Sequence, residues 1–125
     1  MVLEQKKKHF EKLLKRNISH IIQKKTKDPR IGFVTVTRIV LSDDLHNARI
    51  FISVLGTKEE QEKSMKGLYS ATKFIRAELA FGLKKYRFTP YISFHYDKEL
   101  EKVYQVMAQV YRLEKEKETD KEDAE

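Results

Sequence analysis

The stretch "IGFVTVTRIVLSDDLHNARIFISVLG" (residues 31–56) decides the fold. Its outer parts, residues 31–42 and 46–56, are rich in Val, Ile, Thr and Phe, which favour extended structure. Between them, "SDDL" (42–45) supplies Ser and Asp side chains that can bond their own backbone in a turn. The pattern predicts an antiparallel hairpin. Period-two alternation predicts that the second strand buries one face: Ala48, Ile50, Ile52 and Val54.

Apolar spacing predicts helices on both sides of this hairpin. In residues 3–22 apolar positions recur at three- and four-residue steps, as in an amphipathic helix with one buried stripe. The stripe consists of Leu3, Phe10, Leu13, Leu14, Ile18, Ile21 and Ile22. Pro29 disfavours helix in the residue before it, so this helix is expected to end before Asp28. Residues 58–70 and 72–86 look like two further helices, joined near Gly67 and Ser70, and residues 98–113 look like a last helix.

A third strand is expected at "TPYISFHYD" (89–97). The order is then helix, strand, strand, helix, helix, strand, helix, which is α+β, with helices stacked on one face of a three-stranded sheet. A strand that returns to a sheet after helices usually does so by a right-handed crossover. The third strand is therefore predicted to be parallel to one of the hairpin strands.

Length and composition limit the class of protein. A chain of 125 residues is expected to form one domain, residues 1–113, followed by a charged tail, residues 114–125, which has no apolar stripe and is predicted to be disordered. The chain has no cysteine, which excludes disulfides and thiolate zinc sites and fits a reducing compartment. No apolar run approaches the roughly 18 residues that span a bilayer, and the N-terminus lacks the apolar segment of a secretory signal. We expect a soluble cytoplasmic protein without a membrane partner.

The charge is distributed unevenly along the chain. Residues 1–30 hold ten Lys/Arg against three acids, residues 31–113 thirteen against nine, and residues 114–125 three against seven. The predicted domain therefore carries a net charge of +11. Such a field attracts polyanions. The alternative is that a charged surface serves solubility alone.

The candidate contacts to phosphate lie in three places: the first helix with its exit arm "QKKTKDPRIG" (23–32), the later helical pair, and "KKYR" (84–87). They are Lys8, Lys12, Lys15, Arg16, Lys24, Lys25, Lys27, Arg30, Lys73, Arg76, Lys84, Lys85 and Arg87. Phosphate contacts need only charge and reach, which these side chains supply. Lys73 and Arg76 are three residues apart and share a helix face. Tyr69, Tyr86 and Tyr91 could stack on bases or could be core-edge residues.

No pattern for catalysis stands out. The four histidines are scattered, without the converging ligands of a zinc site. Asp43, Asp44 and His46 could form a hard-metal nuclease site, but two Asp residues in a hairpin turn are simpler to explain as backbone caps. The four glycines form no phosphate-binding loop, and no activated-serine motif is present. We expect a binding protein that is not an enzyme and uses no metal, cofactor or small-molecule substrate.

Three blocks of sequence resemble one known family. "KDPRIGFVTVTRIVLSDDLHNARIFISVLG" (27–56), "ATKFIRAEL" (71–79) and "RFTPYISFHYD" (87–97) closely resemble bacterial ribosome-binding factor A. The blocks occur in the right order at the right intervals, and the resemblance runs from about Leu13 to Tyr111. The strongest matches are residues 27–30, 42–45 and 74–76.

This resemblance implies a type II KH-like domain that binds the free small ribosomal subunit and its rRNA. It also implies a role in late maturation of that RNA, notably 16S 5′-end processing, and in growth in the cold, without catalysis. An ordinary KH domain clamps nucleic acid with a Gly-x-x-Gly loop, which the family replaces with an Ala-x-Gly interhelical kink. Here the kink residues are Ala71, Thr72 and Lys73, so lysine stands in place of glycine. The arm is then expected to meet ribosomal RNA backbone, and the protein is expected to be a monomer. The alternative is a general KH-like RNA chaperone without preference for the ribosome.

Overall fold

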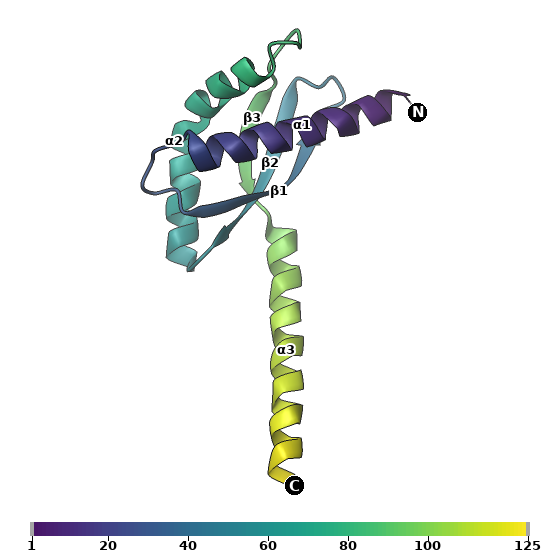
Figure 1. Cartoon of the computed structure of the whole chain (residues 1–125), viewed down its shortest axis with the longest axis vertical. Coiled ribbons are helices and arrows are strands. Elements are labelled where there is room, and N and C mark those ends of the chain that lie inside the picture. Colours follow the sequence, from purple (N-terminus) through teal and green to yellow (C-terminus); the bar gives the residue numbers. More distant parts are fainter. Residues whose placement is uncertain (1, 125) are drawn as a thin grey trace.

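A computed structural model of the protein describes residues 2–124, and the side chains of residues 3–117. Figure 1 shows a three-stranded sheet with two helices lying across it and a third helix that leaves it. The elements, in order along the chain, are α1 (Val2–Lys24), β1 (Phe33–Leu41), β2 (Asn47–Leu55), α2 (Lys58–Gly82), β3 (Tyr91–Tyr96) and α3 (Lys98–Ala124). The predicted α+β class is confirmed.

The sheet has the strand order β1-β2-β3. β1 and β2 are antiparallel, as the hairpin prediction requires, and β3 is parallel to β2, as predicted for a crossover strand. The ladder between β1 and β2 shifts register between Val36 and Arg38. The extra residue of this bulge is Thr37, whose hydroxyl oxygen lies 3.2 Å from the Phe51 carbonyl oxygen.

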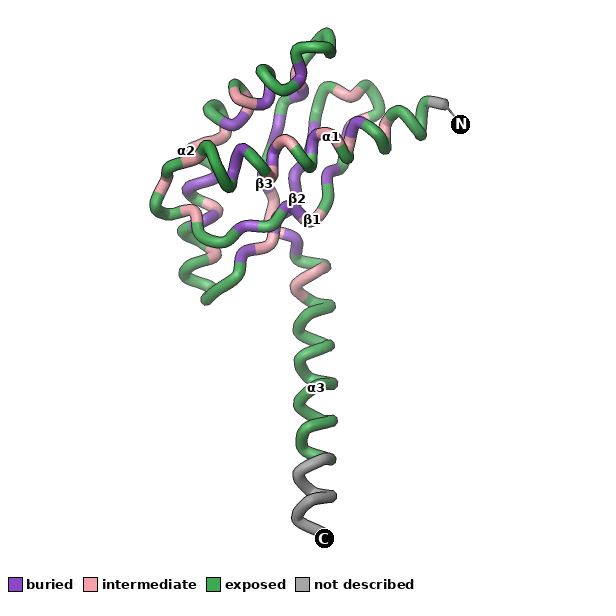
Figure 2. Tube along the Cα trace, in the orientation of Figure 1, coloured by how far each residue is buried: buried purple, intermediate pink, exposed green. Residues whose placement is uncertain are grey.

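The core lies between one face of the sheet and helices α1 and α2. The predicted inner face of β2 is buried, with Ala48, Ile50, Ile52 and Val54 at most 5% exposed. Five of the predicted α1 stripe residues are buried as well: Phe10, Leu14, Ile18, Ile21 and Ile22. Leu3 is an exception, because it is 82% exposed. Figure 2 shows that buried positions recur along α1 and α2 and along the strands.

The prediction of two helices in residues 58–86 is wrong, because α2 is one continuous helix from Lys58 to Gly82. It begins at the N-cap Thr57, whose side chain accepts a hydrogen bond from the Glu60 N–H. Figure 1 shows that α2 changes direction partway along its length. The helix bends, but residues 71–73 do not interrupt it.

α3 differs most from expectation. Its first turn touches the sheet, but residues 102–117 are exposed on every side, and the helix does not join α1 and α2 on the sheet (Figure 2). Its apolar positions, including Val103, Met107 and Val110, are therefore exposed. The helix also continues to Ala124, beyond the predicted end at residue 113. Residues 114–124, where the sequence predicts a disordered tail, thus continue the helix in the structure, and residue 125 lies outside the described residues. The division of the chain into a domain and a tail stays a prediction.

One buried carboxylate, Asp97, fixes the start of α3. It is 4% exposed and accepts hydrogen bonds from the Thr37 hydroxyl at 2.6 Å and from the Leu100 N–H at 3.1 Å. Arg38 Nε lies 3.4 Å from the same carboxylate. The hydrogen bond from Thr37 is the main cause that lowers the pKa of Asp97 below its ordinary value of 3.8, with Leu100 and Arg38 adding to it against burial. Asp97 therefore joins the bulge of β1 to the N-terminus of α3.

We expect Asp97→Ala to lower the free energy of unfolding by about 2–3 kcal/mol at neutral pH, because it removes a helix cap and leaves buried donors without an acceptor. A carboxyl whose pKa is lowered by folding stabilises the protein above its unfolded pKa, and this stabilisation is lost as pH falls through the folded pKa. The difference between Asp97→Ala and the parent should therefore shrink in acid. Denaturant unfolding at neutral pH and near pH 3 measures both effects. Asp43→Ala is the control, because Asp43 is fully exposed and should change stability by less than about 0.5 kcal/mol.

Candidate nucleic-acid interface

The outer face of α1 carries a row of cations. Helical positions advance about 100° per residue, so Lys8, Lys12, Lys15 and Arg16 fall on one side of the helix, away from Leu14 and the core. All four are exposed. Lys15 Nζ lies 3.4 Å from the Thr37 carbonyl oxygen, and within residues 3–117 no hydrogen bond or ion pair holds the other three. This row is open to an external anion.

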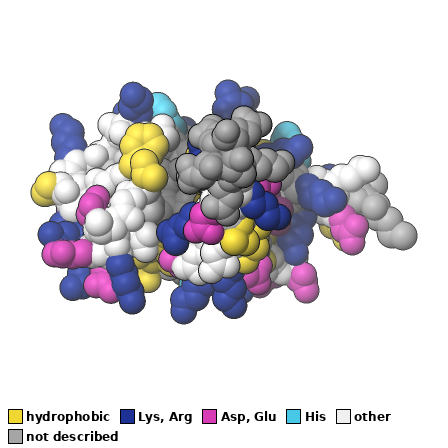
Figure 3. Space-filling view, turned by 90° about the horizontal axis from the view of Figure 1, so that it is seen from below, with side chains coloured by type: hydrophobic (Ala, Val, Ile, Leu, Met, Phe, Trp, Pro, Cys, Tyr) yellow, Lys and Arg dark blue, Asp and Glu magenta, His cyan; other side chains and the backbone are white. Residues whose placement is uncertain are grey.

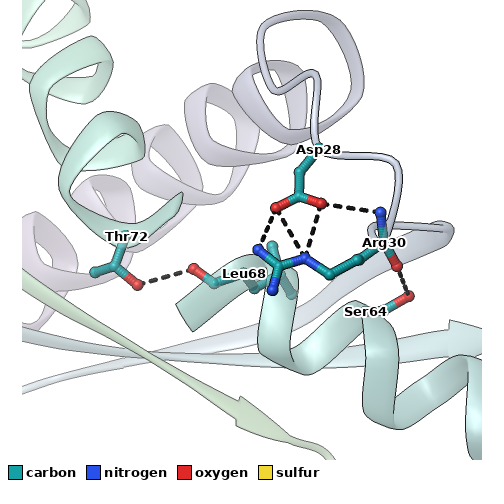
Figure 4. Close-up of polar contacts among 5 residues, drawn as sticks. All are labelled: Asp28, Arg30, Ser64, Leu68 and Thr72. Atoms are coloured by element: carbon teal, nitrogen blue, oxygen red, sulfur yellow. Dashed lines mark hydrogen bonds and ion pairs between the residues drawn. The ribbon is translucent and has the colours of Figure 1, made fainter. Parts of the chain in front are cut away.

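The arm, residues 23–32, continues the basic row beyond α1. Lys24, Lys25 and Lys27 are exposed, and none of the three has a hydrogen-bond or ion-pair partner among the described side chains. The far end of the arm is fixed on α2 by Ser64. The buried Ser64 hydroxyl accepts from the Gly32 N–H at 3.0 Å and donates to the Arg30 carbonyl at 3.3 Å; Figure 4 shows the contact with Arg30.

A close approach at Gly67 adds to this anchor. A Cβ atom at Gly67 would lie 2.6 Å from Ile31 Cγ1 and 3.4 Å from Arg30 Cβ. The arm therefore crosses α2 where the helix has no side chain. Ser64 and Gly67 are not among the predicted site residues. A glycine in the interior of a helix is the signal for such an approach, because glycine there costs about 1 kcal/mol relative to alanine.

Arg30 has a partner inside the arm. Its guanidinium contacts the Asp28 carboxylate through Nη2 at 2.6 Å and Nε at 3.0 Å, and its backbone N–H donates to the same carboxylate at 2.9 Å (Figure 4). These hydrogen bonds lower the pKa of Asp28 to about 2 and raise the pKa of Arg30. Because Asp28 offsets its charge, Arg30 shapes the arm, and its predicted contact with RNA stays a prediction.

The arm and Ala71, the first of the predicted kink residues of α2, lie next to each other. They border an open groove of about 450 Å³, lined by Lys25, Lys27, Ala71 and Phe74 among others. The Thr72 hydroxyl donates to the Leu68 carbonyl at 2.9 Å, a bond back along the helix that often accompanies bending (Figure 4). Lys73 is exposed, but it does not line this groove. The structure thus brings Ala71 next to the arm, although more than forty residues separate it from the start of the arm in the sequence.

Arg76 is held from within the chain. Its Nη2 donates to the Thr89 carbonyl at 2.9 Å and its Nε to the Pro90 carbonyl at 3.2 Å. Its guanidinium lies 4.4 Å from the centre of the Tyr91 ring. These contacts fix the loop that enters β3, so Arg76 positions that loop, and its predicted contact with phosphate stays a prediction.

The third basic group lies on the loop after α2. Lys84, Lys85 and Arg87 are exposed, while the Tyr86 ring packs on Phe10 of α1 with 5.2 Å between ring centroids. This contact sets the loop beside the N-terminal half of α1. The three predicted stacking residues, Tyr69, Tyr86 and Tyr91, are 57%, 43% and 64% exposed.

The turn between β1 and β2 supports the capping interpretation of Asp44. Its carboxylate accepts from the Ser42 hydroxyl at 2.6 Å and from the His46 N–H at 3.0 Å, and these bonds lower its pKa. Asp43 lies 3.5 Å from Lys7 Nζ. Among the described residues, no three His, Asp or Glu side chains are grouped so as to hold a metal ion. Nor is any described helix both long and apolar enough to span a bilayer.

The end of the molecule from which α3 emerges has a mixed charge. Figure 3 shows acidic and basic side chains interspersed there. Of the predicted contact residues on α1, the arm and the loop after α2, Arg30 alone has an acidic partner among the described side chains. Apart from Arg76, which is partly buried, the predicted contact residues, including Lys73, are all exposed.

Comparison with known proteins identifies relatives over almost the whole chain. The family model described as ribosome-binding factor A matches residues 6–110. A ribosome-binding factor A of Halothermothrix orenii is 40% identical over 119 residues, which cover 95% of this chain and 97% of the relative. One of Natranaerobius thermophilus is 46% identical over 96 residues, which cover 77% of this chain and 72% of the relative.

Structures of ribosome-binding factor A proteins resemble the fold of this chain. The crystal structure of ribosome-binding factor A from Thermus thermophilus has a TM-score of 0.59 at 27% identity and covers 70% of this chain and 91% of its own. A solution structure of a Thermotoga maritima protein described as a ribosome binding factor A has a TM-score of 0.62 at 33% identity, covering 72% and 85%. A homology model of the Thermus factor, fitted into a cryo-EM map of its 30S complex, has a TM-score of 0.58 at 28% identity, covering 70% and 90%. These likenesses confirm the predicted KH-like fold.

Proposed function

The chain belongs to the ribosome-binding factor A family, and on this premise we propose that it binds the free small ribosomal subunit through the backbone of its RNA. In this proposal it assists late maturation of that RNA, including processing of the 16S 5′ end, as a cytoplasmic monomer that catalyses no reaction itself. The relative fitted into a 30S complex supports this partner.

The observation that carries the proposal is the set of cations on α1 and the arm that have no internal partner. Lys8, Lys12 and Arg16 on α1 and the three arm lysines are exposed, and no acidic side chain of the described residues pairs with them. Surface charges that serve solubility alone need not be gathered away from acids. Exposed Lys and Arg side chains suit the phosphate contacts that dominate nucleic-acid affinity.

We expect binding to purified small subunits to weaken steeply with salt, because each neutralised phosphate contributes roughly 0.7–0.9 to the slope of log affinity against log salt. Sedimentation of the protein with small subunits through sucrose gradients at several salt concentrations measures this slope. An affinity that does not change with salt concentration would contradict binding through phosphate contacts.

Two further measurements separate the proposal from its alternatives. Competition with bulk structured RNA distinguishes a subunit-binding factor from a general RNA chaperone, which would bind both equally well. Depletion of the protein in cells should cause 16S precursor with an unprocessed 5′ end to accumulate. Pure protein incubated with that precursor and Mg²⁺ should leave it uncut.

A further inference from the structure

A second concave site lies at the opposite end of α1 from the arm. It is an open cavity of about 580 Å³ between the first turns of α1, the turn from β1 to β2, and the loop from α2 to β3. Figure 1 shows these three segments at the same end of the molecule. We call this cavity the ring pocket; its lining includes Lys6, His9, Leu45, Tyr86, Arg87 and Phe88.

The walls of the ring pocket are largely apolar, and the rings of Phe10, Tyr86 and Phe88 contribute to them. Tyr86 and Phe88 are 43% and 38% exposed, so part of each ring remains free. Each ring packs on another ring. Tyr86 packs on Phe10, and Phe88 is stacked on His46 with 4.4 Å between ring centroids. The rings are therefore held in place before any ligand arrives, which lowers the entropy lost on binding.

Leu45 completes the pocket at the cost of a strained backbone. It has a positive φ of 64°, a conformation that large side chains rarely adopt. The turn holds it there: the Leu45 N–H donates to the Ser42 carbonyl at 2.9 Å, and the Asp44 carboxylate receives the next N–H. A glycine or asparagine would suit this position better, but glycine would remove the apolar wall. Such strain is often found at binding sites.

The ring pocket also has two cationic side chains in its lining. Lys6 and Arg87 line the pocket and are exposed, and no ion pair or hydrogen bond engages either within the described part of the chain. The nearby acid Asp43 contacts Lys7 instead. Aromatic rings and cationic side chains in one lining suit a ligand that joins a flat ring to an anion. An aliphatic protein side chain would use the rings but not the charges.

We propose that the ring pocket takes one unpaired nucleobase of RNA, stacked on Tyr86 and Phe88, with an adjacent phosphate held by Lys6 and Arg87. This rests on the proposed function and gives it a contact that backbone charge alone does not supply. Base stacking on aromatic side chains tolerates any sequence, so the pocket would select unpaired nucleotides over duplex.

The test uses a single-stranded RNA of about ten nucleotides, a length typical of such sites, with 2-aminopurine at its centre. The fluorescence of this base falls when it stacks. The full chain should quench it, and the double variant Tyr86→Leu/Phe88→Leu should weaken binding at least about fivefold and abolish the quenching. Leucine keeps apolar bulk against Phe10 and His46, and thermal melting checks the fold. Tyr104→Leu is the matched control, because Tyr104 is an exposed ring on α3.

A second variant covers the case in which the double variant does not fold. Arg87→Gln changes an exposed side chain, and it should weaken binding by about fivefold and lower the salt slope by roughly 0.7, the loss of one phosphate contact. If Tyr86→Leu/Phe88→Leu left both quenching and affinity unchanged, the ring pocket would not bind a nucleobase and would be assigned to a protein ligand. If only Arg87→Gln folds, an unchanged result in that variant would lead to the same conclusion. Sedimentation of the unaltered protein with small subunits tests the proposed function separately, so either claim can fail alone.

Discussion

Replacing Lys24, Lys25 and Lys27 together with alanine is expected to weaken binding to the small ribosomal subunit about 10²-fold near 0.1 M salt. Three phosphate contacts, each contributing roughly 0.7–0.9 to the salt slope, account for a loss of this size. The slope itself should fall by about 2 to 3. Sedimentation or fluorescence anisotropy with labelled protein, at several salt concentrations, measures affinity and slope together.

Stability should not change in this triple variant. The three lysines are exposed and make no ion pair or hydrogen bond within residues 3–117, so the melting temperature should stay within about 2 °C of the parent value. A triple variant of Lys58, Lys98 and Lys102 removes the same charge from exposed positions near the start of α3, where acids are interspersed (Figure 3). Equal losses in both variants would mean that net charge matters and the arm has no special role.

The sheet could be predicted in detail because patterns within single segments, and the order of those segments along the chain, specify it. Alternation at Ala48, Ile50, Ile52 and Val54 encodes the buried face of β2, and the position of β3 after a long crossover encodes its parallel pairing. The break predicted in α2 is wrong for an equally physical reason. Gly67 resembles a weak point of the helix, whereas it makes room for Ile31, a residue far away in sequence.

α3 shows the limit of periodicity. Its apolar positions follow a regular helical spacing, but spacing does not say whether a partner is present, and residues 102–117 are exposed. What fixes the helix is Asp97, through contacts with Thr37 and Arg38 on another strand. An Asp before a helix is a recognisable cap signal, but the bulge that brings Thr37 to it cannot be read from the sequence.

The exposed cations of the candidate interface could be predicted from the sequence. The contacts that hold some of its arginines within the protein were not predicted. Exposed lysines follow from a helix face opposite the apolar stripe. Arg30 could have been paired with Asp28, two residues before it, from sequence alone. The carbonyl partners of Arg76, at Thr89 and Pro90, belong to an irregular loop that no pattern specifies. The ring pocket combines three separate segments and so leaves no linear motif.

Gly67→Val is expected to lower the free energy of unfolding by about 2 kcal/mol or more. Valine would place Cβ 2.6 Å from Ile31 Cγ1 at a buried crossing, and overpacking of this kind typically costs about 1–3 kcal/mol. Valine has a better helix propensity than glycine, but this offsets only about 0.4 kcal/mol of the loss. The variant should also weaken binding to the small subunit, because a displaced Ile31 loosens the arm that Ser64 and Gly67 hold. Denaturant unfolding measures the first effect, and sedimentation of the folded variant measures the second.

Ser70→Val is the matched control. Ser70 is exposed on the same helix, and serine and valine have similar helix propensities, so stability should change by less than about 0.5 kcal/mol. Gly67→Ala should fall between the two, because a gain of about 1 kcal/mol in helix propensity opposes the same contact with Ile31. If Gly67→Val unfolded at the parent's denaturant concentration, the arm would not be packed on α2. The arm lysines would then lie on a flexible linker. Ordering that linker on RNA would cost conformational entropy and so reduce the affinity.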